Sequence, residues 1–189
     1  MLKKFFNYVF ELIKVVVISL AIIIPVRYYL IQPFYVKGAS MEPNFYDGEY
    51  ILTDKVSYRF REPARGDVVI FKAPKNPELD YIKRIIALPG ESIKIQNGDF
   101  FINNQKLNEV YLPNKTAFSG GLFLPQEKEI KIPQNSYFVF GDNRSHSSDS
   151  REWGPIQKSD IVGRAFLRYW PPQRIGVISS TSCKYFLSP

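Results

Sequence analysis

The sequence has very few of the residues that most often bind metals or form disulfides. Its 189 residues include one cysteine, Cys183, and one histidine, His146. A single cysteine excludes a disulfide within the chain, and a single histidine excludes metal centres built on several imidazoles. Catalysis by this chain would therefore depend on Ser, Thr, Lys, Asp or Glu, or on a triad that contains His146.

The net charge is positive, and the excess is unevenly distributed. The chain has 25 basic and 18 acidic residues, a formal net charge of +7. The first 37 residues hold five basic residues and one acidic residue, a net +4, whereas the remaining residues hold 20 and 17, a net +3. A basic protein often has an acidic partner, such as nucleic acid or an anionic membrane. Because the excess is concentrated near the N-terminus, we expect membrane lipid as the partner and no nucleic acid.

Residues 12–31 form one long apolar segment, LIKVVVISLAIIIPVRYYLI. Twenty helical residues span roughly 30 Å, the thickness of the hydrocarbon core of a bilayer. Lys14 and Arg27 lie near its ends, where long side chains reach the headgroups. A cleaved signal peptide is the alternative, but the nearby small-x-small triplet, Ser19-Leu20-Ala21, lies inside the apolar run. We therefore predict a retained transmembrane helix.

The charges that flank this segment predict its orientation. Three lysines lie on its N-terminal side and two basic residues on its C-terminal side, a weak positive-inside signal. We predict a short cytoplasmic segment at residues 1–11 and an extracytoplasmic domain at residues 32–189. The protein is then a single-pass membrane protein.

After residue 33 the sequence has the pattern of a β protein. Short runs rich in Val, Ile, Phe and Tyr alternate with Gly, Pro, Asn and Asp, which is typical of strands and turns. Asn97-Gly98 predicts a type I′ hairpin turn. Between residues 104 and 134 we expect long loops or an inserted hairpin. The fold class is therefore mainly β, an antiparallel sheet domain on one helix, with strands at 49–54, 66–72, 81–88, 92–103, 136–141 and 162–170.

Three segments carry residues suited to catalysis. The first is GASMEP at residues 38–43, where small residues before Ser40 leave its hydroxyl accessible. The second is YIKRII at residues 81–86, where a period of two places Lys83 on one face with Tyr81 and Ile85. Burial of Lys83 would lower its pKa towards neutrality, at a cost of roughly 4 kcal/mol for three pH units. Taken alone, each of these two segments is more often explained without catalysis, by a loop serine and by a solvated lysine at a strand edge.

The third segment is a polar loop, GDNRSHSSDSREWG, at residues 141–154. Its alternating Asp and Arg residues suit charge pairs that hold a loop rigid. Such a loop would orient a catalytic amine through Ser145 or Ser147. A polar surface turn is the alternative.

Together, in this order and after an N-terminal span, these segments resemble the bacterial type I signal peptidases. Four boxes of that family are present, and a C-terminal box is similar to that of cyanobacterial and plastid members. The boxes are Ser40-Met41-Glu42-Pro43, Arg65-Gly66-Asp67-Val68-Val69, residues 83–91, residues 141–154 and Arg168-Tyr169-Trp170-Pro171-Pro172.

The resemblance implies a serine protease with a Ser/Lys dyad and no metal or cofactor. Ser40 would be the nucleophile, Lys83 the general base, and Ser147 the serine that hydrogen-bonds the lysine. Gly38 stands where some members have a hydroxyl residue that contributes to the oxyanion hole, so this hole would rely on the Ser40 N–H and another donor such as water. The residues implied to hold the catalytic loop in shape are Asp142, Arg144, Asp149 and Arg151.

The resemblance also implies what the enzyme acts on and where. Its substrates would be secretory preproteins, cut after a small-x-small motif, with the Sec or Tat export machinery nearby. The location would be the plasma membrane, or the thylakoid membrane. The substrate would add as an extended strand beside residues 34–37 and 81–83. The residues expected to bind it are Phe34, Val36, Tyr81 and Ile82.

Three alternatives remain open. A Ser40/His146/Asp triad would match eukaryotic relatives, although His146 lies in the polar loop. The self-cleaving repressors share the Ser/Lys core, but those proteins carry a DNA-binding head in place of an apolar anchor. A membrane-tethered β domain without catalytic activity would use the same boxes for structure alone.

Overall fold

The N-terminal part of the chain is one long helix that leads directly into the β domain. In the computed structural model, which describes residues 2–112 and 120–179, helix α1 (Leu2–Pro25) continues as a π-helical segment, η1 (Val26–Leu30), and then enters strand β1 (Ile31–Tyr35). Proline lacks an N–H and its ring crowds the preceding turn, which explains why the α-helical pattern ends there. The helix therefore includes most of residues 1–11, which the sequence suggested as a separate segment.

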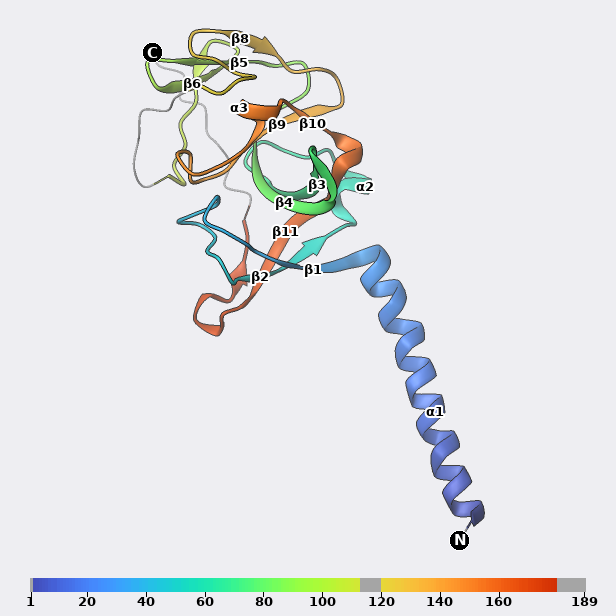
Figure 1. Cartoon of the computed structure of the whole chain (residues 1–189). Helices are drawn as coiled ribbons and strands as arrows, with labels where there is room; N and C mark the ends of the chain where they lie inside the picture. Colours follow the sequence, from blue (N-terminus) through green and yellow to red (C-terminus); the bar gives the residue numbers. More distant parts are fainter. Residues whose placement is uncertain (1, 113–119, 180–189) are drawn as a thin grey trace.

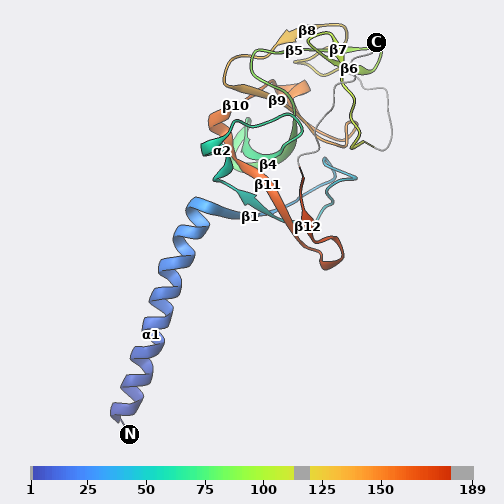
Figure 2. The same cartoon turned by 180° about the vertical axis from the view of Figure 1, so that it is seen from behind.

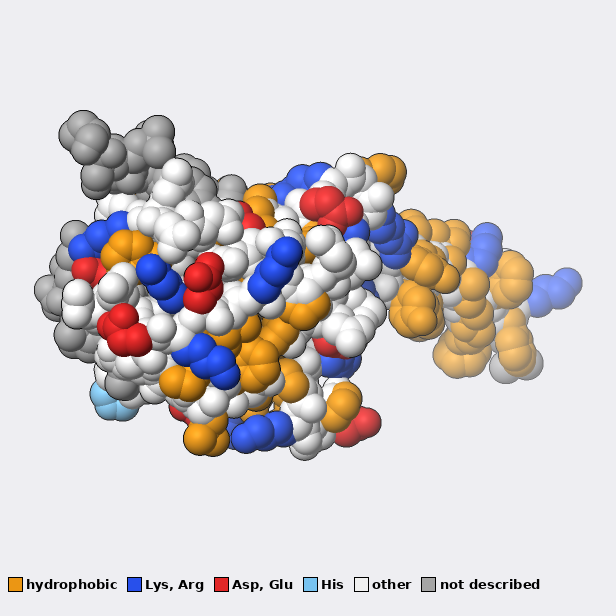
Figure 3. All heavy atoms as spheres, turned by 90° about the horizontal axis from the view of Figure 1, so that it is seen from above, with side chains coloured by type: hydrophobic (Ala, Val, Ile, Leu, Met, Phe, Trp, Pro, Cys, Tyr) orange, Lys and Arg blue, Asp and Glu red, His pale blue; other side chains and the backbone are white. Residues whose placement is uncertain are grey.

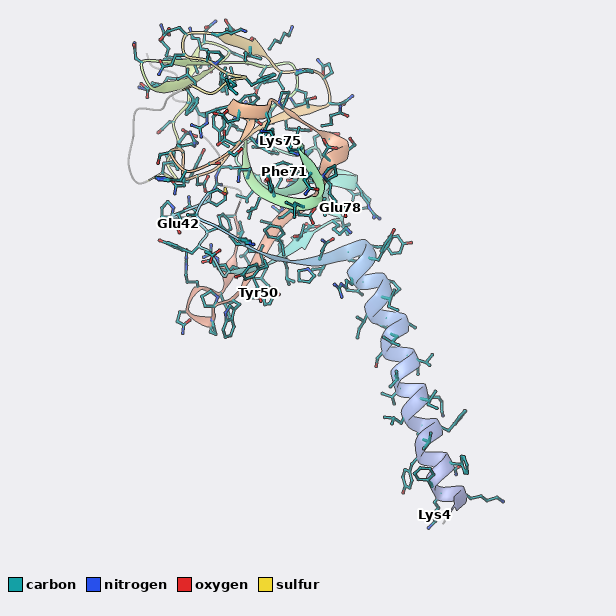
Figure 4. The ribbon with its side chains drawn as sticks, in the orientation of Figure 1. Lys4, Glu42, Tyr50, Phe71, Lys75 and Glu78 are labelled. Carbon is teal, nitrogen blue, oxygen red and sulfur yellow. The ribbon has the colours of Figure 1, made fainter. Side chains whose placement is uncertain are left out.

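Helix α1 makes no use of its apolar surface for packing. Its described side chains are exposed, and they point in all directions around the helix in Figure 4. Figures 1 and 2 show the helix projecting away from the β domain in both views. By length and composition, Lys3–Leu30 is able to cross a membrane. A long apolar helix that no other described part of the chain covers is what a membrane anchor requires.

The β domain consists of two antiparallel sheets. The larger sheet has the order β1-β2-β11-β3-β4-β9-β10, with β12 paired to β11, and the smaller has the order β7-β6-β5-β8. The mainly β, antiparallel fold is thereby confirmed. The remaining strands are β2 (Tyr50–Asp54), β3 (Val68–Ala73), β4 (Asn76–Ala87), β5 (Ser92–Gln96), β6 (Asp99–Ile102), β7 (Gln105–Lys106), β8 (Glu129–Lys131), β9 (Ser136–Phe140), β10 (Ile156–Gln157), β11 (Ile161–Trp170) and β12 (Gly176–Val177). The short helices are α2 (Ser57–Phe60), α3 (Ser150–Trp153), η2 (Lys158–Asp160) and η3 (Pro172–Arg174).

Each strand predicted from the sequence is present, but β4 begins at Asn76, five residues before the predicted start at residue 81. Asn97 and Gly98 have φ angles of 51° and 77°, as the predicted hairpin turn between β5 and β6 requires. In the region from 104 to 134, β7 and β8 extend this hairpin into the smaller sheet. The part of this region at residues 113–119 lies outside the described residues. Strand β1 was not predicted, because it is short and follows the apolar segment without a turn.

The larger sheet is curled, and this curvature makes the site. Ser40 follows β1 and Lys83 lies on β4, and three strands separate β1 from β4 in the sheet order. In a flat sheet, strands four places apart would be about 19 Å from each other. Figure 1 shows β4 as a strongly bent ribbon. Buried residues fill the inside of the curl beneath the site: Val36, Met41, Phe45, Ile51, Val68, Ile70, Ile82 and Ala165.

Candidate active site

Ser40 lies in a tight turn directly after β1. Gly38 has a φ of +83°, a conformation that favours glycine, and its N–H donates to Asp47 Oδ1 at 2.6 Å. The loop at residues 141–154 holds this turn from the other side, since the Asn143 N–H donates to the Ser40 carbonyl oxygen at 3.1 Å. The Asn143 side chain donates to the Ala39 carbonyl oxygen at 3.0 Å. These contacts fix the backbone of the candidate nucleophile.

Lys83 lies on β4 with its amine against the Ser40 hydroxyl. Its Nζ is 2.8 Å from Ser40 Oγ and donates to the Ile82 carbonyl oxygen at 3.0 Å. The residue is only 4% exposed. Loss of hydration lowers the pKa of Lys83 to about 8, even though the carboxylates of Asp149 and Asp142 favour its charged form. A buried amine with this pKa is available as a base near neutral pH.

Asp142 connects the polar loop to the strand that carries Lys83. Its two carboxylate oxygens accept hydrogen bonds from Arg84 Nε at 2.8 Å and Arg84 Nη2 at 2.6 Å. Both side chains are almost completely buried. Asn44 Nδ2 also donates to Asp142 Oδ2, at 2.8 Å. A bidentate, buried pair of this kind fixes geometry strongly, so the loop and β4 are held together one residue from the lysine.

A second buried pair holds the loop closed on itself. Asp149 accepts hydrogen bonds from Arg151 Nε and Nη2, both at 2.8 Å, and from the Gly141 N–H at 3.1 Å. Arg151 also donates to the Arg144 carbonyl oxygen at 2.7 Å. Arg144 in turn pairs with Glu109 from outside the loop. The four charged residues expected to shape the loop are therefore all buried and paired.

A groove with a volume of about 340 Å³ runs past the Ser40 hydroxyl. It lies between β1 and β4, and both strands present a free edge there. Among the strands of the described residues, β1 pairs only with β2, and β4 pairs with β9 only from Arg84 onwards. The groove is lined by Phe34, Tyr35, Lys37, Ser40, Leu79, Asp80, Tyr81, Ile82, Lys83 and Ser148.

Comparison with known proteins shows the protein family to which this chain belongs. The sequence profile of the family described as "Signal peptidase, peptidase S26" matches residues 9–170, most of the chain. The chain belongs to this family. It is therefore a serine peptidase, and the resemblance seen in the sequence boxes is confirmed.

Curated members of the signal peptidase family are similar over most of the chain. A "Probable signal peptidase I-2" from Synechocystis is 34% identical over 174 residues, which cover 89% of this chain and 77% of the relative. "Signal peptidase I P" from Bacillus subtilis subsp. natto is 36% identical over 171 residues, 88% of this chain and 92% of the relative. A crystal structure of a signal peptidase I from Enterococcus faecalis is 27% identical, covering 55% of this chain and 97% of that one, with a TM-score of 0.45.

Ser147 lies beside Ser40 but does not make the hydrogen bond to Lys83 that the resemblance implies. Ser147 Oγ and the Ser40 carbonyl oxygen both lie close to Gly141. A Cβ atom built on this glycine would be 2.2 Å from the hydroxyl oxygen and 2.4 Å from the carbonyl oxygen. Ser147 Oγ is buried, and it has no hydrogen-bond partner among the described residues. The implied hydrogen bond from Ser147 to Lys83 is therefore not formed here. The Ile82 carbonyl oxygen orients the amine in its place.

Three of the four expected substrate-binding residues line the groove, and one does not. Phe34, Tyr81 and Ile82 contribute to its walls. Val36 is 1% exposed and packs in the core cluster beneath the site. The strand alternation of β1 turns Val36 inwards, so it supports the groove from below.

His146 lies at the surface, where it is the pale-blue side chain in Figure 3. Its Nδ1 is within hydrogen-bond distance of Ser145 Oγ, at 2.9 Å, and Asn143 Oδ1, at 3.3 Å. Both partners belong to its own loop, so the geometry does not support a triad with Ser40. Among residues 2–112 and 120–179, no group of three or more His, Cys, Asp or Glu is arranged to bind a metal ion.

The C-terminal box contributes to the site through a cluster that the sequence did not reveal. Glu49 is 2% exposed and pairs with Arg168 Nε at 2.8 Å and Arg174 Nη1 at 2.6 Å. Both arginines also donate to the Asn44 carbonyl oxygen. Because the Asn44 side chain binds Asp142, this cluster connects the end of the chain to the catalytic loop. Its residues lie far apart in sequence, and no local pattern indicates the pairing.

Proposed function

We propose that this protein is a membrane-anchored endopeptidase that removes signal peptides from secretory preproteins. Ser40 is the nucleophile and Lys83 is the general base. The observation that carries the proposal is the 2.8 Å contact between Lys83 Nζ and Ser40 Oγ, made by a buried amine whose pKa is lowered to about 8. A nucleophile and a base within hydrogen-bond reach, beside a groove for an extended chain, are what peptide hydrolysis needs.

The reaction proceeds through an acyl-enzyme. Neutral Lys83 removes the proton from Ser40 Oγ while the oxygen attacks the carbonyl carbon of the scissile bond. The lysine ammonium then gives this proton to the leaving amine, and the mature protein departs. Lys83, neutral again, removes a proton from water as the water attacks the ester. The lysine finally returns that proton to Ser40 Oγ, which releases the signal peptide as a carboxylic acid.

The oxyanion of the tetrahedral intermediate is stabilised mainly by the backbone N–H of Ser40. Gly38 has no side-chain hydroxyl to contribute a second donor. The contacts of Asn143 with Ser40 and Ala39 hold this stretch of backbone in one conformation. Preorganised donors of this kind usually account for much of the rate enhancement in acyl transfer.

The substrate binds as an extended strand between the free edges of β1 and β4. Phe34, Tyr81 and Ile82 form the apolar part of the groove wall, which accepts only small side chains at the first and third positions before the cut. This arrangement accounts for cleavage after a small-x-small sequence. Val36 shapes the floor of the groove without touching the substrate.

The anchor places this reaction at the membrane. Helix α1 and η1 cross the bilayer with the N-terminus in the cytoplasm, and the β domain lies on the outer side of the plasma membrane or at the thylakoid membrane. Preproteins reach this side through the Sec or Tat machinery. Membrane lipid surrounds the apolar surface of α1, which no side chain among residues 2–112 and 120–179 covers.

The test uses the full-length protein in detergent with a secretory preprotein. We expect one cut after a small-x-small sequence, identified by N-terminal sequencing of the product. Ser40→Ala and Lys83→Ala should each abolish the cut, whereas His146→Ala should leave it unchanged. Full activity of the Lys83 variant, or loss of activity in the His146 variant, would overturn the dyad. An intact preprotein after incubation with the wild type would favour a non-enzymatic binding module.

A further inference from the structure

The groove carries a positive charge close to the nucleophile. Lys37 and Asp80 both line it together with Ser40. Asp80 is neutralised by Lys72, whose Nζ lies 2.8 Å from its carboxylate. Lys37 is exposed, and within the described part of the chain no carboxylate lies within 4.0 Å of its amine. Asp47, near in sequence, is engaged by the Gly38 N–H. Since Lys83 is neutral when it acts as base, Lys37 is the charge that a bound substrate meets.

The backbone of β1 determines which way Lys37 faces. The Val36 N–H donates to the Glu49 carbonyl oxygen at 2.8 Å, and the Val36 carbonyl oxygen accepts from the Gly48 N–H at 3.0 Å. Both polar groups of Val36 are therefore directed at the neighbouring strand. In an antiparallel pair, the residues on either side, Tyr35 and Lys37, direct their backbone N–H and carbonyl groups at the unpaired edge of β1. Side chains alternate in the same way, so Val36 faces the core, whereas Tyr35 and Lys37 are exposed on the other face.

A substrate strand added to this edge has the same alternation. Its small first and third residues before the cut must face the apolar side of the groove, where Phe34 and Ile82 lie. Its second residue then faces the opposite side, which is the face of Lys37. Side chains on the same face of adjacent strands interact directly. The variable residue of the small-x-small sequence therefore lies on the face that Lys37 shares with Tyr35, and of these two residues only Lys37 carries a charge and lies towards Ser40.

We propose that Lys37 selects substrates with an acidic residue at the second position before the cut. This inference rests on the proposed function and deepens it. An exposed ion pair is worth little, so the preference for Glu over Gln at this position should be about threefold in kcat/KM at low salt. Screening should strongly reduce this preference for Glu at 0.5 M salt, where the Debye length is only about 4 Å.

The test uses full-length enzyme in detergent and three peptides with the same small-x-small sequence. The peptides carry Glu, Gln or Lys at the second position. We expect the wild type to prefer them in the order Glu, Gln, Lys. Lys37→Gln should cleave all three at similar rates, and Lys37→Glu should invert the order. Lys131→Gln, which removes an exposed charge from β8 in the smaller sheet, is the matched control and should keep the order of the wild type.

The outcomes separate this inference from the proposed function. Ser40-dependent cleavage of the Gln peptide supports the proposed function. If the order of rates is then the same in the wild type and in both Lys37 variants, the inference about Lys37 is overturned and the proposed function stands. A charge preference that Lys37 controls at the first residue after the cut, and not at the second before it, would also overturn it. Failure of the wild type to cut any peptide would overturn both.

Discussion

Replacing Lys83 by methionine should make the protein more stable while it abolishes catalysis. Burial lowers the pKa of this lysine from 10.5 to about 8, so the folded state resists its charged form. Below pH 8 this difference corresponds to about 3 kcal/mol of lost stability. Methionine has a similar volume and no charge, and it loses only two hydrogen bonds worth about 1 kcal/mol or less each. The expected net gain is about 2 kcal/mol.

Thermal unfolding of the full-length protein in detergent, followed by circular dichroism, measures this effect. For a domain of this size a gain of 2 kcal/mol corresponds to a rise in Tm of about 4–8 °C. The gain should depend on pH. Between pH 8 and 10.5 the unfolded chain still binds the lysine proton and the folded chain has lost it, so the wild type becomes more stable as pH rises. The advantage of Lys83→Met should therefore shrink across this window.

A matched control is Lys72→Met on the neighbouring strand β3. Its side chain is 47% exposed and pairs with Asp80 at the surface, so the Tm should change little at any pH. Two results would refute the reasoning. One is a Lys83→Met protein no more stable than the wild type at pH 6.5. The other is a stability gain that grows between pH 8 and 10.

Three further predictions concern the same network. The kcat/KM of the wild type on a peptide should rise with pH and level off above about 8, since the lowered pKa of Lys83, the proposed general base, governs the fraction of neutral amine; a flat profile from pH 6 to 9 would contradict it. Gly141→Ala places a Cβ 2.2 Å from Ser147 Oγ and should reduce activity at least about 100-fold, whereas Gly176→Ala, with nothing within 4 Å, should not. Glu49→Gln leaves its two arginines without a counter-charge and should lower the Tm by about 4–8 °C, measured by thermal unfolding.

Local patterns were sufficient to predict the longer strands and the N-terminal helix. The alternation of residues, the Asn97-Gly98 turn and the apolar block at 12–31 each predict a structure that depends mainly on neighbouring residues. Strand β1 was missed because its five residues, IQPFY, follow the apolar block without a turn and include a proline. Such a strand is stable only because β2 pairs with it, which is a long-range effect.

The site could be predicted in its residue types but not in its contacts. The order of the boxes identifies Ser40 and Lys83 as partners, but the curl that brings them together depends on the packing of the whole sheet. Arg84 illustrates the limit. A Lys-Arg pair on a strand is usually solvated, and yet Arg84 is 3% exposed because Asp142 pairs with it from a segment 58 residues away. Ion pairs between distant segments have no local signature.

The direct passage from η1 into β1 has a consequence for how the enzyme meets its substrates. No linker separates the anchor from the domain, and the Lys55 N–H donates to the Leu30 carbonyl oxygen at 3.0 Å, which fastens the end of the helix to the segment after β2. In the membrane arrangement proposed above, the groove is thus held at a fixed height above the lipid. Enzyme and preprotein then search for each other by lateral diffusion in a plane. The quantity that governs turnover in the cell is the surface density of the two proteins, which a KM measured with a soluble peptide does not report.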